Sequence, residues 1–300
     1  MFERHARRVF TKKHSLPELY GRLMARAGPH WPPVERHEVH LLYRRFAGDG
    51  VGPTKLLGKT SHFTVAYESS LGPVGLASAQ CVLEKCEQDY KTLSSWFKVA
   101  PPHFNVVVAS VSEGGLELAY HDTCQSTDLI CDAGNGVGDP ADYTVALVAA
   151  EVTEVFEALQ HKGWNCAAAN GEALSRVLAV ELHPGALDHH SVAPAWLDHD
   201  RVDVVNRNYP TDTNPVANGC GVLFLNWLHY QLGYGWDQIV QAAAPTLAMT
   251  YQLLTGLRED PFPRFLSLLD AQLPRGRDCQ DVPDNPFPLT QQKRQGSTTP

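Results

Sequence analysis

The sequence predicts an α+β protein, with strands in its first half and helices in its second half. Residues 62–69 alternate apolar and polar side chains, as a half-buried strand does. Residues 73–98 instead repeat apolar side chains at helical spacing for about seven turns. From residue 142 onward, helical spacing continues through successive segments. A run of strands followed by a run of helices favours α+β over an alternating α/β fold.

The β-rich half contains further expected strands at residues 37–46, 104–111, 116–121 and 128–134. Gly114-Gly115 predicts a hairpin between the strands at 104–111 and 116–121. The glycine-rich stretch 132–140 lacks a phosphate-loop lysine and does not fit G-x-G-x-x-G. We therefore expect a plain loop there.

The helical half contains expected helices at residues 142–161, 170–182, 219–233, 236–243, 245–255 and 261–273. Lys162-Gly163 and His183-Pro184 are typical stops for the first two. Residues 184–216 are expected to be irregular.

Composition suggests three parts along the chain. Residues 1–60, rich in Pro, Gly, His and Arg, are interpreted as an N-terminal extension. Residues 61–274 form the expected main domain, β-rich over 61–140 and helical over 141–274. The polar residues 275–300 are expected to form a flexible C-terminal tail.

Charge and hydropathy limit the partners. The chain has 25 basic and 33 acidic residues, a net charge of −8, which disfavours nucleic acids and anionic membranes. It contains no apolar run long enough to cross a bilayer and no secretory signal. We therefore expect a cytoplasmic, soluble protein with no nucleic-acid or membrane partner. The oligomeric state is left open.

Seven cysteines occur at irregular spacing, at positions 81, 86, 124, 131, 166, 220 and 279. No C-x-x-C pair is present, so a zinc knuckle is not expected. We expect all seven to be reduced, with a Cys124–Cys131 disulfide as the alternative.

Three glutamates on two otherwise apolar helices form the candidate site. Glu151 and Glu154 lie one helical turn apart and share a face that meets the core. Glu172 opens the next helix, four residues before Arg176, which could pair with it. Carboxylates in a partly dry site repel each other and need a metal, an arginine or shared protons. The alternative is that they face solvent, with Glu172 serving its own helix N-terminus.

The order of these elements resembles that of the gluzincin metallopeptidases. Strands and an edge strand precede a glutamate-bearing helix, a loop and a helix that opens N-G-E-A-L-S-R. In that family the first helix carries H-E-x-x-H and the second carries a glutamate that completes the zinc site. The interval between Glu154 and Glu172, 172 − 154 = 18 residues, is close to the family's interval. The resemblance covers residues 62–273 and implies a zincin-like fold with a small mixed or antiparallel sheet.

The resemblance also implies roles, and the chain departs from the family at the metal. Laid over residues 150–154, the motif has Ala150 at the first zinc ligand and Glu154 at the second. Glu151 takes the general-base position, and Glu172 the third ligand position. Tyr209 takes the place of a side chain that stabilises an oxyanion. Carboxylates without imidazole favour Mg²⁺, Mn²⁺ or Ca²⁺ over zinc, so ordinary zinc peptidase activity is not expected.

Several histidines could replace the lost ligand: His121, His183, His189, His190 and His199. His121 ends an expected strand, and the other four follow the second helix. Histidines in a polar loop are more often solvated than bound to a metal.

Three functions remain open. The chain could bind a peptide or protein in the former active-site cleft without zinc proteolysis. It could instead be a hydrolase or other acid–base enzyme that uses Glu151, Glu154 and Glu172, with or without a divalent metal. In the third reading the resemblance is accidental and the glutamates of a helical scaffold face solvent.

Overall fold

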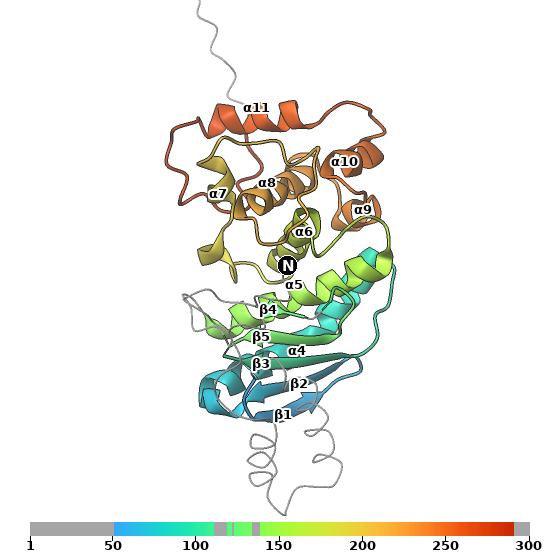
Figure 1. The fold of residues 1–300 in the computed structure, drawn as a ribbon, viewed down its shortest axis with the longest axis vertical. Coiled ribbons are helices and arrows are strands. Elements are labelled where there is room, and N and C mark those ends of the chain that lie inside the picture. The colour runs from blue at the N-terminus through green and yellow to red at the C-terminus, as the bar shows by residue number, and fades with distance from the viewer. Residues whose placement is uncertain (1–50, 111–118, 122, 134–138, 291–300) are drawn as a thin grey trace, which may run out of the picture. The chain divides into compact units, whose positions relative to one another are not determined.

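The computed structural model describes residues 51–110, 119–121, 123–133 and 139–290 (Figure 1). Residues 1–50, with the strand expected at 37–46, lie outside these ranges, as do Gly114-Gly115, most of the stretch 132–140 and residues 291–300. The described chain is mixed α+β, as the sequence predicts.

The described strands are β1 (Thr54–Lys59), β2 (Phe63–Glu68), β3 (Phe104–Ala109), β4 (Ala119–Tyr120) and β5 (Asp128–Asp132). The longer helices are α4 (Gly72–Phe97), α5 (Pro140–Gln160), α6 (Ala169–Leu182), α8 (Pro215–Asn226), α10 (Leu247–Thr255) and α11 (Phe262–Gln272). The short helical segments are η2 (Ser69–Leu71), η3 (Asp188–His190), α7 (Ala193–Leu197), η4 (Trp227–Gln231) and α9 (Trp236–Gln241).

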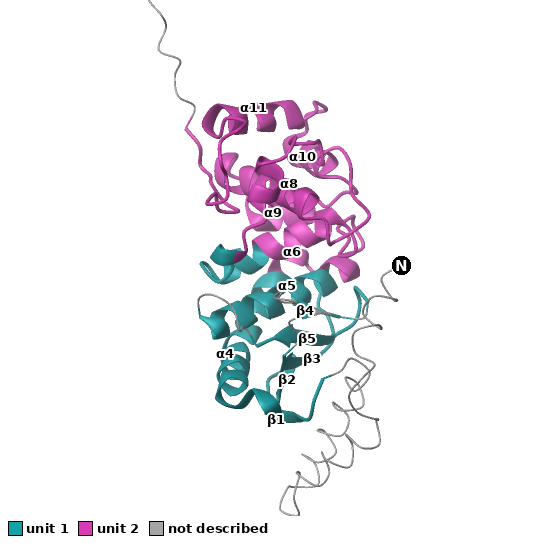
Figure 2. Cartoon of the chain, turned by 60° about the vertical axis from the view of Figure 1, so that its left-hand side comes forward, with its two compact units in different colours: residues 1–94, 99–156, 178–189 teal, residues 95–98, 157–177, 190–300 magenta. Residues whose placement is uncertain are grey.

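The chain divides into two compact units, coloured separately in Figure 2. Among the described residues, unit 1 contains 51–94, 99–156 and 178–189, and unit 2 contains the rest. Both α5 and α6 contribute residues to each unit. Both helices thus cross the division between the units, whereas the sequence places a change from β-rich to helical chain at residue 140.

The sheet of unit 1 has the order β1-β2-β3-β5-β4 (Figure 1). Its central strands β2, β3 and β5 run parallel, and β1 and β4 pair antiparallel at the two edges. Every residue of β3 is buried. An apolar strand buried throughout is typical of the middle of a sheet with parallel neighbours.

Two expectations about the strands are wrong. The hairpin between the strands at 104–111 and 116–121 does not form, because β5 lies between β3 and β4. The apolar strand β3 pairs in parallel with β2 on one side and with β5 on the other. The short β4 therefore pairs with the outer edge of β5. In addition, β1 belongs to the sheet although it lies inside the expected extension 1–60.

Tyr90 of α4 links the helices of unit 1 to the sheet. Its ring packs edge to face on Phe63 of β2, Phe104 of β3 and Phe156 of α5, with centroids 6.2, 6.4 and 5.5 Å apart. Its hydroxyl donates to the carbonyl of Pro101 at 2.8 Å. This packing holds α5, the glutamate-bearing helix, in place against the sheet.

The core of unit 2 is an aromatic cluster drawn from four helices and η4. Phe265 of α11 lies with its ring centroid 5.9 Å from Trp196, 5.2 Å from Phe224 and 5.7 Å from Trp227. Trp227 also stacks on Tyr251 of α10 at 5.8 Å. The apolar residues that recur at helical spacing in the second half of the sequence form this core.

The helices of unit 2 begin and end at residues suited to those positions. Asn214 accepts from the N–H groups of the first turn of α8, and Pro215 starts that helix. Thr246 caps α10 in the same way. Gly256 ends α10 with φ 70°, a conformation that glycine adopts without steric cost.

Residues 275–290 are part of unit 2, so the expected flexible tail is wrong over this range. Cys279, Val282 and Phe287 are buried there. Asp284, also buried, accepts hydrogen bonds from two main-chain N–H groups at 2.7 and 2.8 Å. The polar composition of the segment conceals these few anchoring residues.

None of the helices described has both the length and the apolar character needed to span a bilayer.

Candidate functional site

Glu151 and Glu154 lie on α5 in unit 1, and both are buried. Their side chains are 11% and 10% exposed. Thr153 between them is turned into the helix, where its hydroxyl donates to the carbonyl of Ala149 at 2.8 Å. The reading in which this pair faces solvent is therefore wrong, since the two carboxylates share one largely dry face.

His121 contacts both carboxylates. It follows β4 directly, and its Nε2 lies 2.9 Å from Oε2 of Glu154 and 3.6 Å from Oε2 of Glu151. The imidazole is 5% exposed. We call these three residues the His121 centre.

The ring orientation of His121 follows from its other nitrogen. Nδ1 lies 3.3 Å from the main-chain carbonyl of Ser126, which can only accept, so Nδ1 carries a proton. Nε2 is then the nitrogen that contacts the two carboxylates or offers a lone pair to a cation.

The strand next to β4 adds two polar groups to this region. Cys131 and Asp132 end β5, and Cys131 pairs in register with Ala119 of β4. Burial raises the pKa of the Cys131 thiol well above its usual value, and the charges of Glu151 and Asp132 raise it further. The thiol therefore stays protonated at neutral pH and is a poor nucleophile.

The cysteines do not all match the expectation. Cys124 and Cys166 are disulfide-bonded, whereas Cys131 is a free, buried thiol. The expectation that all seven are reduced is wrong, and so is the alternative Cys124–Cys131 pairing. Disulfides persist mainly in oxidising compartments, which weighs against the cytoplasmic expectation.

Glu172 lies in unit 2, in the first turn of α6, and is half-buried. The structure thus brings Glu151 and Glu154 together within one unit, while Glu172 belongs to the other. Arg176, expected as a partner of Glu172, instead forms an ion pair with Asp284, with Nε 2.8 Å from Oδ2. Arg176 also donates to the carbonyl of His190.

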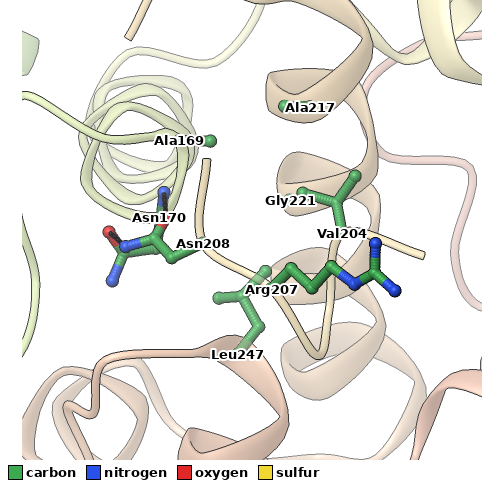
Figure 3. A pocket seen from close by; sticks show the side chains of 8 residues that line it. All are labelled: Ala169, Asn170, Val204, Arg207, Asn208, Ala217, Gly221 and Leu247. Atoms are coloured by element: carbon green, nitrogen blue, oxygen red, sulfur yellow. Dashed lines mark hydrogen bonds between the residues drawn. The ribbon is translucent and has the colours of Figure 1, made fainter. Parts of the chain in front are cut away.

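Tyr209 contacts the start of α6 through its main chain. Its carbonyl accepts from the N–H of Ala169 at 3.0 Å. Next to it, the side chains of Asn208 and Asn170 face each other, with Nδ2 of Asn208 2.7 Å from Oδ1 of Asn170 (Figure 3). The main chain of Tyr209 thus anchors its loop to α6 within unit 2, and the oxyanion role expected for its side chain stays a prediction.

The depression drawn in Figure 3 lies beside these asparagines. It is lined by residues of α6, α8, α10 and the 204–208 loop, and it leaves no space for a water molecule. It is a seam between packed elements.

The other four candidate histidines, all among the described residues, do not join the His121 centre. His183 is buried and its Nε2 lies 2.9 Å from Oδ2 of Asp89 on α4, a separate pair within unit 1. His189 and His199 are exposed, and His190 is half-buried. The expectation that loop histidines are mostly solvated holds for His189 and His199.

Sequence reasoning left His121 as one of five equal alternatives. The signal that could have singled it out is its position at the end of the strand preceding β5, the last strand before α5. His121 lies at the sheet edge near the glutamate helix only because its strand pairs with β5. The expected hairpin would have paired that strand with residues 104–111 and placed His121 elsewhere.

Comparison with known proteins adds no assignment: no protein-family model matches the chain, and no curated protein matches it significantly.

Proposed function

We propose that this chain is a divergent gluzincin-fold hydrolase whose His121 centre works with a bound divalent cation on a peptide or protein substrate. The observation that carries the proposal is the approach of His121 Nε2 to Glu154 at 2.9 Å and to Glu151 at 3.6 Å. It provides an imidazole where the sequence of α5 has lost both histidines of H-E-x-x-H. A mixed sheet whose edge strand ends beside the glutamate helix supports the zincin-like fold.

The donor set fits a divalent cation. An imidazole beside a carboxylate suits Zn²⁺, Mn²⁺ or Fe²⁺ better than carboxylates alone. Two ligands of a tetrahedral ion with bonds of about 2.1 Å lie about 3.4 Å apart. Nε2 of His121 and Oε2 of Glu154, 2.9 Å apart, need only a small side-chain shift to reach that separation. The contact of Nδ1 with the Ser126 carbonyl is the outer-sphere bond that orients metal-bound histidines.

The residues of the His121 centre would have different roles. His121 and Glu154, the closer pair, would hold the cation. Glu151, the carboxylate farther from the imidazole, remains for proton transfer, as its position in the family motif implies. A bound divalent cation would polarise a substrate carbonyl and acidify a water molecule.

The test is cleavage of a mixed-peptide library, followed by mass spectrometry, with the protein supplied with Zn²⁺ or Mn²⁺. Wild-type protein should cleave, and Glu151→Gln should lower the rate by about 10²- to 10⁴-fold while the cation stays bound. Glu84→Gln, which changes an exposed glutamate on α4, is the matched control and should keep wild-type activity. Equal rates for Glu151→Gln and wild type would contradict the proposal.

A second candidate is a peptide-binding protein without catalysis, and Ala150 favours it. Alanine at the first ligand position leaves α5 with no imidazole of its own. The same library, incubated with immobilised protein in chelator, separates the two functions. Intact peptides retained equally by wild type and Glu151→Gln would support the binding protein and count against the hydrolase.

A further inference from the structure

Unit 2 contains a cavity of about 160 Å³ that the His121 centre does not involve. The cavity lies among η4, α11 and the segment near residue 289. Its lining residues are Trp227, Gln231, Leu232, Arg264, Leu268 and Leu289.

The cavity as a whole has the volume of a small ring, and part of its wall is apolar. Trp227 and Leu268 are buried, and Leu232 and Leu289 are half-buried. An apolar cavity of about 150 Å³ accommodates a benzene molecule. A ligand body of six or seven carbons therefore fits here, and its burial would remove apolar surface from water.

The polar part of the cavity offers hydrogen-bond donors. Oε1 of Gln231 accepts from the N–H of Leu289 at 2.6 Å, so the amide nitrogen of Gln231 is the end left to donate. Arg264 can only donate, and its Cζ lies 5.9 Å from the centre of the Trp227 ring. Among the six lining residues none is acidic. An anion with hydrogen-bond acceptors matches this set.

The backbone at the cavity is also unusual. The N–H of Leu232 donates to the carbonyl of Trp227, five residues earlier, at 3.0 Å, which makes η4 a π turn. Such turns are rare and occur frequently at functional sites. Here Trp227, Gln231 and Leu232 at its two ends all line the cavity.

We propose that this cavity binds a small monocarboxylate with an aromatic or similarly sized apolar body. The ring lies against Trp227 and Leu268, and the carboxylate accepts hydrogen bonds from Arg264 and Gln231. A charge-assisted contact with a guanidinium gives the pocket its preference for an anion over a neutral molecule of the same shape.

Benzoate is the probe, with benzyl alcohol and benzylamine as the neutral and cationic comparisons. Binding to the full chain is measured by calorimetry and by saturation-transfer NMR. Benzoate should bind one site per chain at least about tenfold more tightly than benzyl alcohol, and benzylamine should not bind.

Variants separate this site from weak surface binding. Arg264→Gln should weaken the binding of benzoate about fivefold or more, because it removes the positive charge that faces the carboxylate. Arg264 is exposed, so the substitution should not disturb the core. Arg258→Gln, an exposed arginine outside the lining, is the matched control and should bind as wild type does. Leu289→Trp should abolish binding by filling the cavity. Failure of benzoate to bind wild type at about 10 mM, or equal binding by Arg264→Gln, would overturn the proposal.

Discussion

Nε2 of His121 lies 2.9 Å from Oε2 of Glu154, although 33 residues separate them in the chain. Both side chains are about nine-tenths buried. A close buried pair of this kind is coupled, because removing one member leaves the other's polar group without its neighbour.

His121→Ala is expected to lower the free energy of unfolding by about 3–5 kcal/mol, because the buried carboxylates lose their imidazole. A double-mutant cycle with Glu154→Ala, measured by urea denaturation, should give a coupling energy of about 1–3 kcal/mol. The Lys85–Asp142 pair, with side chains 40% and 50% exposed, is the control and should give less than about 1 kcal/mol. Similar values for the two pairs would count against a tightly coupled centre.

Glu87 should make folding stability depend on pH in the acid range. Burial alone would raise its pKa, but hydrogen bonds from Thr60 and His62 outweigh burial and lower it to about 2 from 4.5. Because the folded pKa is the lower one, this contribution is present above pH 4.5 and is lost as the pH falls toward 2. Denaturant titrations of wild type and Glu87→Gln at several pH values give the free energy of unfolding as a function of pH. Between pH 4.5 and 2 this free energy should fall less steeply for the variant. A slope unchanged by the substitution would refute the assignment, and Glu84→Gln should keep the wild-type slope.

Asp284 should be important for the stability of unit 2. It accepts from the N–H groups of Val192 and Ala193 and pairs with Arg176 at 2.8 Å. Asp284→Ala should therefore lower the free energy of unfolding by about 2–4 kcal/mol, measured by denaturant titration. Asp281→Ala, an exposed residue three positions earlier, should change it by less than about 0.5 kcal/mol. If the two variants were equally stable, residues 275–290 would be a dispensable tail.

The cysteine states give a prediction about thiol number. The chain has seven cysteines, of which five are free, 7 − 5 = 2 being disulfide-bonded. Protein denatured without reductant and treated with a thiol reagent should show five thiols per chain, and seven after reduction. Seven thiols in the unreduced sample would contradict the disulfide and support the expectation from the sequence that all cysteines are reduced.

The helices could be predicted from the sequence more reliably than the sheet. α4, α5 and α6 each begin and end within two residues of the expected ranges, because apolar spacing over several turns is a local signal. Strand pairing is not local. β5 lies between β3 and β4, so the expected hairpin between those two strands does not form.

The candidate site shows the same limit. The spacing of Glu151 and Glu154 places both on one helix face, although the sequence alone also allowed that face to meet solvent. Their contact with His121 depends on the pairing of β4 with β5, which no local pattern encodes. Residues 275–290 read as a tail because Cys279 and Phe287 are too sparse to form a periodic pattern.

The central claim is that the His121 centre holds a divalent cation, and calorimetric titration of metal-free protein with Zn²⁺ or Mn²⁺ tests it most directly. Wild-type protein should bind one cation per chain, and His121→Ala and Glu154→Ala should each weaken binding at least about tenfold. His103→Ala, which changes a histidine bonded to Thr64 elsewhere in unit 1, should bind as wild type does. No binding to wild type, or wild-type binding by His121→Ala, would contradict the claim.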